Sequence, residues 1–351
     1  MIIHSFTNDY SEGCHPAILE ALTRSNMEQQ AGYGDDEYSK RAEQHLRNLT
    51  EKPDADIYLV SGGTIANLLV LSSILKPFES VIAADTGHIN THEAGAIEAT
   101  GHKVEIVSSP DGKLCPDDIQ PLLEKFPEYH TVRPRVVYIS NSTEIGTIYT
   151  KMELIELSEF CRTNDLYLFM DGARLASALT ASSNELTLKD IACLTDVFYL
   201  GGTKSGALFG EAIVITNDNL KKDFKYHQKQ RGAMLAKGRT LGIQFDTLLK
   251  DGLIFDLSRH ANNMAAKITK ALKKMDHHNF LTDSDTNQIF PVLPLRTIEE
   301  LEKRYDFYIW EHINSEEAAI RMVTSWATPE VKVDAFIADL EPVSYTHLTL
   351  P

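Results

Sequence analysis

The chain has 351 residues, of which 43% are hydrophobic, and its formal net charge of −16 accompanies an isoelectric point near 5.2. At about 150 residues per domain, this length predicts two domains with a sizeable core. The acidic balance argues against a nucleic-acid partner, because a phosphate backbone would be repelled unless a local basic patch intervened. No segment approaches the roughly 20 apolar residues that a membrane-spanning helix needs.

The four cysteines and the amino terminus further restrict the class of protein. The cysteines lie far apart without a CxxC pair, and the histidines form no cluster at metal-ligand spacing. We therefore expect no metal site and no disulfide framework. The scattered cysteines suit a reducing compartment, and the first residues do not combine a basic segment with an apolar stretch, so we expect a cytoplasmic protein.

From residue 57 the chain repeats a short β-branched or aromatic run, a turn rich in Gly, Ser, Thr or Asp, and a helical pattern. The predicted strands are 57–60, 81–84, 104–107, 136–139, 167–170 and 197–200. The predicted helices are 65–75, 93–99, 116–126, 152–164 and 175–179. This alternation predicts an α/β fold with a mostly parallel sheet flanked by helices, whose ligands bind at the carboxyl ends of the strands. Residues 211–216 read as one more strand, with an antiparallel orientation as an option.

The last hundred residues predict a smaller α+β domain. Residues 248–274 fit one or two helices, and strands are expected near 289–293, 307–310 and 320–324. We therefore expect a large ligand-binding domain over 1–247, which includes the amino-terminal segment, and a small domain over 248–340. Residues 341–351 continue neither the helical pattern nor a motif, and we interpret them as a non-native tail, with a native edge strand as the alternative.

A glycine-rich turn follows the first predicted strand. Ser61, Gly62, Gly63 and Thr64 open an apolar helix. Backbone amides at the start of a helix bind a phosphate well, with help from the helix dipole and a Thr hydroxyl. Taken alone the signal is weak, because such a turn is often only a helix N-cap.

An aspartate and a lysine follow two later strands. Asp171 ends the run 167–170, and Lys204 follows 197–200 in a glycine-rich turn. Burial there can lower the pKa of the amine enough for Schiff-base formation, and a carboxylate can keep a ring nitrogen protonated. Pyridoxal 5′-phosphate (PLP) needs these two groups in this order. Taken singly, Lys204 is more often a solvated surface residue and Asp171 a structural residue or a metal ligand.

Arg174 and His88 are candidates that depend on this pair. Arg174 lies three residues after Asp171, where its guanidinium suits a substrate carboxylate or a cofactor oxygen, with a surface salt bridge as the alternative. His88 follows another predicted strand end and can stack on a cofactor ring or act as a base. A lone histidine is more often structural.

Together these stretches resemble the threonine aldolase family, in the beta-eliminating lyase branch of fold-type I PLP enzymes. The resemblance covers about residues 5–340, and no single motif is decisive. The matching stretches follow the family order, at residues 8–9, 32–36, 61–67, 88–95, 143–146, 171–174, 201–206 and 321–324.

The resemblance implies a role for each candidate. It assigns PLP to Gly63, Thr64, His88, Asp171, Arg174, Lys204, Lys237 and Arg239. It assigns the amino-acid substrate to Asn8, Glu93, Arg174 and Arg321. Lys204 would carry PLP as a Schiff base, Asp171 would pair with its ring nitrogen, and His88 would stack over the ring and take part in proton transfer. Lys237 or Arg239 would reach the phosphate of a neighbouring subunit, which implies a homodimer or homotetramer with shared active sites.

Two departures from the family pattern affect these roles. The common phosphate stretch Gly-Gly-x-Met-Arg-Gln is replaced by one that ends in Lys237, Gly238 and Arg239, so either cation is a candidate. The frequent Glu-Asn-Thr-His is replaced by residues 141–144, where Glu144 stands in place of a second active-site histidine. Glu144 therefore joins Lys204, His88 and Asp171 as a candidate catalytic residue, with a changed pH profile.

The resemblance implies a PLP-dependent lyase that cleaves threonine or allo-threonine to glycine and an aldehyde by a retro-aldol reaction. One alternative keeps PLP in another β-eliminating lyase or an aminotransferase acting on small amino acids. A third hypothesis is a PLP-free α/β binding protein, in which Asp171 and Lys204 form a structural pair.

Overall fold

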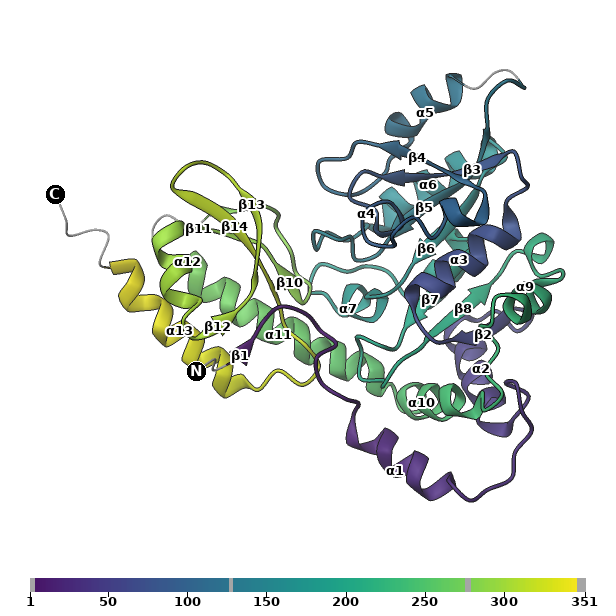
Figure 1. Cartoon of the computed structure of the whole chain (residues 1–351), viewed down its shortest axis with the longest axis horizontal. Helices are drawn as coiled ribbons and strands as arrows, with labels where there is room; N and C mark the ends of the chain where they lie inside the picture. Colours follow the sequence, from purple (N-terminus) through teal and green to yellow (C-terminus); the bar gives the residue numbers. More distant parts are fainter. Residues whose placement is uncertain (1–3, 126–128, 275–278, 346–351) are drawn as a thin grey trace.

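The computed structural model describes residues 4–125, 129–274 and 279–345, which form a large and a small body (Figure 1). The large body is built on a seven-stranded sheet. Its order is β2 (Asp56–Val60), β8 (Glu211–Ile215), β7 (Val197–Gly201), β6 (Tyr167–Asp171), β5 (Arg133–Ser140), β3 (Glu79–Ala84) and β4 (Lys103–Val107). β8 is antiparallel to both of its neighbours and the other pairs are parallel, which confirms the predicted α/β sheet and the antiparallel option for 211–216.

Alternate side chains of each strand belong to two different cores. On β5, Val137 and Ile139 join one apolar cluster, while Val136 and Tyr138 join the other. Because successive strand side chains point to opposite faces, a sheet that is covered on both faces needs apolar residues at every position. The near-continuous apolar runs in the sequence follow from this burial.

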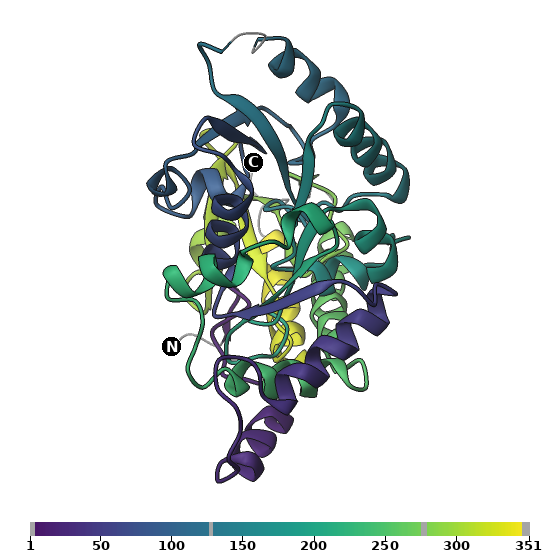
Figure 2. The same ribbon diagram turned by 90° about the vertical axis from the view of Figure 1, so that its right-hand side faces the viewer.

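Helices cover both faces of the sheet. Those of the large body are α1 (Pro16–Ser25), α2 (Glu37–Thr50), α3 (Gly63–Ile74), α4 (His88–Thr91), α5 (Pro116–Glu124), α6 (Lys151–Thr163), α7 (Leu175–Leu179), α8 (Leu188–Leu194), α9 (Phe224–Gln230) and α10 (Arg239–Leu249), with 3-10 turns at Glu98–Thr100 and Asp218–Leu220. α1 lies at the edge of the large body in both views (Figures 1 and 2). Within the described ranges, no helix is both long enough and apolar enough to cross a membrane.

The helix predicted at 93–99 is wrong, because the chain forms α4 earlier and a 3-10 turn later. Ala94 and Gly95 lie between them with φ angles of 51° and 73°. Left-handed residues cannot continue a right-handed helix, so the backbone breaks at this point. The helix that begins at His88 is therefore short and ends at Thr91, before this break.

The small body packs a sheet on α11 (Leu253–Lys273). The strand order is β10 (Gln288–Ile289), β14 (Glu317–Val323), β11 (Pro291–Pro294) and β9 (Asn279–Phe280), and β13 (Tyr308–His312) also pairs with β14. The remaining elements are α12 (Leu295–Leu301), α13 (Glu330–Tyr345) and the pair β1 (His4–Ser5) and β12 (Tyr305–Asp306). This antiparallel sheet with helices confirms the expected α+β character.

The amino-terminal segment contributes to both bodies. Phe6 is fully buried against Tyr305 and Phe336 in the core of the small body, and the chain then continues into α1. The boundary between 1–247 and 248–340 stays a prediction, as does the tail at 341–351. α13 extends to residue 345, and 346–351 lie outside the described residues.

Candidate active site

A cavity of about 380 Å³ lies at the carboxyl ends of β5, β6 and β7, and its lining also includes Trp310 and Arg321 of the small body. It brings together most of the predicted site residues, namely Gly63, Thr64, His88, Glu144, Asp171, Arg174, Lys204 and Arg321. A larger hollow of about 700 Å³ between α1, α2 and α10 has none of them in its lining. The chemistry-bearing residues therefore identify the smaller cavity as the candidate site.

Two glycines let the loops after β6 and β7 approach closely. A Cβ atom on Gly172 would overlap the carbonyl oxygen of Tyr199, and one on Gly201 would overlap that of Ala173. The Gly201 N–H donates to the Gly172 carbonyl at 2.9 Å. Any larger side chain would push apart the two loops that carry Asp171 and Lys204.

Asp171 is buried and held as a carboxylate. Its Oδ2 accepts hydrogen bonds from the Tyr138 hydroxyl at 2.6 Å and from Asn67 Nδ2 at 3.1 Å, and its Oδ1 accepts from the Ala173 N–H at 3.0 Å. Burial alone would raise the pKa of Asp171, but His88 and the Tyr138 hydrogen bond outweigh it, so the pKa lies below its ordinary value. The group stays charged inside the protein.

Lys204 lines the same cavity, and within the described residues its amine has no hydrogen-bond or ion-pair partner. Burial lowers the pKa of Lys204, and the positive charge of Arg174 lowers it further. Asp9, Asp171 and Glu211 act in the opposite direction without cancelling the effect. The amine is thus closer to its neutral, nucleophilic form than a surface lysine is.

A buried chain of hydrogen bonds links His88 to Asp171. Glu93 Oε1 lies 2.8 Å from His88 Nδ1 and accepts from Asn67 Nδ2 at 2.7 Å. Asn67 also donates to Asp171, so one amide bridges the two carboxylates. Glu93 therefore orients His88 from beneath the cavity, and its side chain does not appear in the cavity lining.

Glu144 lies against the amino end of α4. Its Oε1 accepts from the His88 N–H at 3.0 Å and from the Ser140 hydroxyl at 2.7 Å. Burial raises the pKa of Glu144, and the nearby charge of Asp171 adds to the rise although the Ser140 hydrogen bond opposes it. A carboxyl group with a raised pKa in a cavity is a candidate general base.

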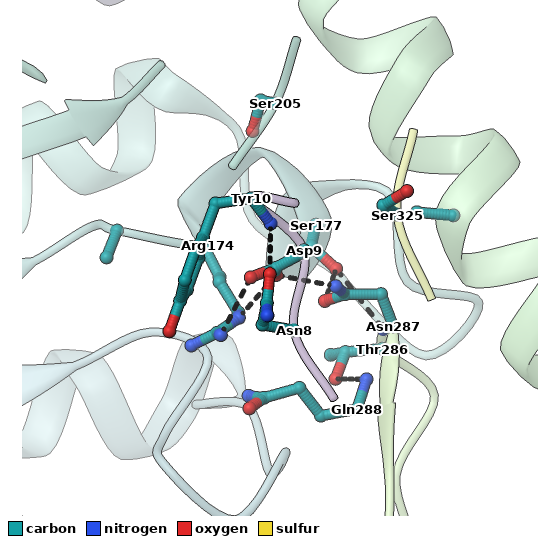
Figure 3. Close-up of polar contacts among 12 residues, drawn as sticks. Asn8, Asp9, Tyr10, Arg174, Ser177, Ser205, Thr286, Asn287, Gln288 and Ser325 are labelled. Carbon is teal, nitrogen blue, oxygen red and sulfur yellow. Dashed lines mark hydrogen bonds and ion pairs between the residues drawn. The ribbon is translucent and has the colours of Figure 1, made fainter. Parts of the chain in front are cut away.

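Arg174 forms an ion pair with Asp9, a residue to which the sequence analysis assigned no role. Its Nε and one terminal nitrogen donate to the two oxygens of Asp9 at 2.7 and 3.0 Å. Asn287 Nδ2 donates to Asp9 at 2.8 Å, and Figure 3 shows Arg174 and Asn287 reaching Asp9 from two sides. This bidentate pair joins the amino-terminal segment to the end of β6 and to the small body.

Arg321 forms fewer hydrogen bonds within the described structure than Arg174 does. One terminal nitrogen donates to Gln288 Oε1 at 2.7 Å, and its Nε is buried without a hydrogen-bond partner in the described structure. Burial and the charge of Arg174 lower the pKa of Arg321 to about 10. A buried cation with an unmet donor is suited to an anionic ligand.

Four predicted residues lie outside the cavity lining, namely Glu93, described above, and Asn8, Lys237 and Arg239. Asn8 accepts hydrogen bonds from the Tyr10 N–H and the Ser11 hydroxyl in a local turn. Arg239 donates to the carbonyls of Ser25 and Glu28 at the end of α1, whereas Lys237 is exposed. Arg239 thus binds carbonyl groups at the end of α1 and just after it.

Several supporting residues were given no role by the sequence. Asp9 and Asn67 lie in two of the motifs quoted above, but their roles depend on contacts with residues 165 and 104 positions away. Tyr138 reads as a buried strand residue, and only the geometry shows its hydroxyl on Asp171. Glu211 likewise reads as the start of a strand, although it lines the cavity.

The fold combines a mostly parallel sheet with a small antiparallel body, and it places a lysine and an aspartate in one cavity at adjacent strand ends. These features define a fold-type I PLP enzyme. A sequence profile of the beta-eliminating lyase family matches residues 6–293, and the chain belongs to this family. It is 35% identical to a low specificity L-threonine aldolase of Pseudomonas sp. over 96% of this chain and 97% of that one.

Solved structures agree with this assignment. A Leishmania major threonine aldolase superposes with a TM-score of 0.95 at 49% identity, covering 97% of this chain and 99% of the other. A Thermus thermophilus aspartate aminotransferase mutant superposes with a TM-score of 0.72 at 13% identity, over 97% of this chain and 91% of that one. The second match shows the fold alone.

Asn67 provides a test of the buried network. Replacing Asn67 by Ala leaves Glu93 and Asp171 without their shared donor, and we expect the free energy of unfolding to fall by about 2 kcal/mol. Urea denaturation of wild type and variant measures this difference. Asn48→Ala, at an exposed position of α2, is the matched control and should change stability by less than about 0.5 kcal/mol. Equal stability of the two variants would contradict the bridging role.

Proposed function

We propose that this protein is a PLP-dependent aldehyde-lyase that cleaves threonine and allo-threonine to glycine and an aldehyde by a retro-aldol reaction. The observation that carries the proposal is that the partly buried Lys204 and the buried Asp171 line one cavity at the ends of adjacent strands. Support for the substrate class comes from the names of relatives that match nearly the whole chain.

The cavity residues fit the cofactor. Lys204 offers a partly buried amine that has no hydrogen-bond or ion-pair partner among the described residues, and Asp171 offers an ionised carboxylate that would pair with a protonated ring nitrogen. Gly63 and Thr64 begin α3, where free backbone N–H groups suit the phosphate. When bound, PLP supplies a conjugated, electron-accepting ring next to the substrate's amino group. His88 lines the cavity and would lie against that ring.

We propose that Arg321 is the main ligand of the substrate carboxylate. Its Nε is a buried donor without a partner among the described residues, whereas Arg174 already uses two nitrogens on Asp9. Arg174 would then position the carboxylate through its remaining nitrogen and its charge. Holding the carboxylate fixes which substrate bond stands perpendicular to the ring, and this orientation decides whether the Cα–Cβ bond breaks.

Glu144 is our proposal for the base that takes the proton from the substrate hydroxyl. Its carboxyl group lines the cavity, is anchored by Ser140 and the His88 N–H, and has a raised pKa. The His88 imidazole, oriented by Glu93, would return a proton to Cα after bond cleavage. Separate groups would therefore handle the two proton transfers.

A product assay tests the reaction. With PLP and L-threonine or L-allo-threonine, we expect glycine and acetaldehyde in equal amounts, because the proposed chemistry breaks only the Cα–Cβ bond. Oxoacid and ammonia as the main products would instead support the alternative, a β-eliminating lyase that also acts on small amino acids such as serine. Transfer of the amino group to an added oxoacid would support an aminotransferase.

The pH profile tests the role of Glu144. A base must be deprotonated to act, so kcat/KM should fall as the pH drops through the raised pKa of Glu144, above the ordinary glutamate value of about 4.3. Glu144→Gln should lower kcat by about 100-fold or more and remove that acid limb. Glu156→Gln, on α6 outside the cavity lining, is the control and should keep the wild-type profile. An unchanged acid limb in Glu144→Gln would assign the base elsewhere.

We also propose a homodimer or homotetramer in which Lys237 reaches the phosphate in the neighbouring subunit. Support comes from the exposure of Lys237, while Arg239 is engaged by the end of α1. Leu19 and Met27, in and just after α1, are 50% and 89% exposed, as expected of a face that another subunit covers.

The four free thiols support a reducing, cytoplasmic location.

A further inference from the structure

Glu211 is a buried carboxyl group in the active-site cavity for which the proposed mechanism has no use. Its side chain begins β8, only 4% of the residue is exposed, and it lines the cavity together with Lys204. Its Oε2 accepts from the Gly202 N–H at 3.0 Å and its Oε1 lies 2.8 Å from the Thr203 hydroxyl oxygen. Both contacts are with the turn that carries Lys204.

The sheet register places this carboxyl group beside the proposed phosphate site. Glu211 is paired with Val60 on β2 and with Gly201 on β7. The glycine-rich turn to Thr64 follows Val60, and the turn with Thr203 follows Gly201. Both turns therefore leave the sheet beside Glu211. Thr203, Gly63 and Thr64 all line the cavity.

A negative charge at this position opposes the binding of a phosphate dianion. Ionised Glu211 also holds the only proton that Thr203 can donate, because the hydroxyl then points to Oε1 and offers only a lone pair to the ligand. The Gly210 N–H donates to Thr203 Oγ1 at 2.9 Å and occupies one of its two acceptor positions.

A proton on Glu211 reverses the direction of this hydrogen bond. The carboxyl O–H then donates to Thr203 Oγ1, while the other carboxyl oxygen still accepts from the Gly202 N–H. Thr203 Oγ1 now accepts two hydrogen bonds, from Glu211 and from the Gly210 N–H, and its own proton is released from Glu211. The Gly210 carbonyl, at 3.5 Å, is only a long-range acceptor for that proton, so a phosphate in the cavity can compete for it. The same heavy atoms thus present either a lone pair or a donor.

We propose that Glu211 and Thr203 form a proton-dependent phosphate clamp, in which Glu211 carries a proton while the cofactor's phosphate is bound and Thr203 donates to that phosphate. Where Glu211 is ionised in the free protein, it takes up this proton from solvent when the phosphate binds. The proposal rests on the assignment of the cavity to PLP and of its phosphate to Gly63 and Thr64. It adds a residue that regulates cofactor retention.

The electrostatics of the cavity support this proton uptake. Burial raises the pKa of Glu211 to about 8, although Thr203 and Lys204 oppose the rise. The titratable groups that face Glu211 are Lys204 after β7, Asp171 on β6 and Tyr199 on β7. A group with this pKa is protonated below about pH 8 and loses the proton above it, so affinity for the phosphate should fall as the pH rises.

Binding of pyridoxamine 5′-phosphate and of pyridoxamine to the protein without cofactor tests the clamp. Neither ligand forms a Schiff base with Lys204, and the ratio of their dissociation constants isolates the phosphate because both meet the same Lys204 and Asp171. Between about pH 7.5 and 9.5 the phosphate stays a dianion, since its second pKa is about 6. We expect the wild-type preference for the phosphorylated ligand to fall by about tenfold per pH unit above pH 8.

The variants separate the clamp from a merely structural contact. Glu211→Gln mimics the protonated acid, because its amide donates to Thr203 and its carbonyl accepts from Gly202, so its preference should stay high and independent of pH. Thr203→Val should weaken the preference at every pH, whereas Thr203→Ser should behave as wild type. Glu105→Gln, a buried glutamate on β4 outside the cavity, should keep the wild-type slope.

Two outcomes overturn the clamp, a pH-independent preference in the wild type or a wild-type slope in Glu211→Gln. Failure of the underlying site assignment looks different. In that case pyridoxamine 5′-phosphate would bind no more tightly than pyridoxamine at any pH, and Thr64→Val would leave the preference unchanged. Circular dichroism of Glu211→Gln confirms that the variant is folded.

Discussion

The partly buried position of Lys204 in the cavity is the constraint on which the site depends. A charged amine is costly to bury, and the protein meets this cost by lowering the pKa of Lys204 and by placing Asp9 and Asp171 near it. Each of these carboxylates is in turn bound by its own donors, Arg174 and Asn287 on one side and Tyr138 and Asn67 on the other. The polar network therefore leaves the amine without a hydrogen-bonded partner of its own in the described structure, free for a ligand.

The arrangement of the strands places this network around one cavity at one edge of the sheet. The neighbouring strands β5, β6 and β7 are parallel, so the loops that follow them all leave the sheet at the same edge. Gly172 and Gly201 let the loops after β6 and β7 contact each other. The antiparallel β8 brings Glu211 to the same edge from the other direction. The lysine, the aspartate, the helix start at Gly63 and the proposed phosphate clamp thus lie around one space, which the small body closes with Arg321.

The sequence predicted the strands of the large sheet and the antiparallel option for 211–216, because apolar runs and glycine-rich turns are local signals. Most of the predicted site residues line the cavity, although Glu144 and Arg321 were found only through the family resemblance. It could not show that Asp9 pairs with Arg174, since that contact joins residues 165 positions apart. The helix predicted at 93–99 was wrong because a left-handed backbone at Ala94 and Gly95 overrides a helical pattern. Glu211 was missed as a site residue because it stands at the start of an apolar run that reads as an ordinary strand.

The most direct measurement of the central claim is the visible absorbance of the purified protein after incubation with PLP and removal of unbound cofactor. The account predicts that wild type and Lys189→Ala, a surface lysine variant, both show the band of a cofactor joined to a lysine, and that Lys204→Ala lacks it. A Lys204→Ala spectrum identical to that of the wild type would contradict the account.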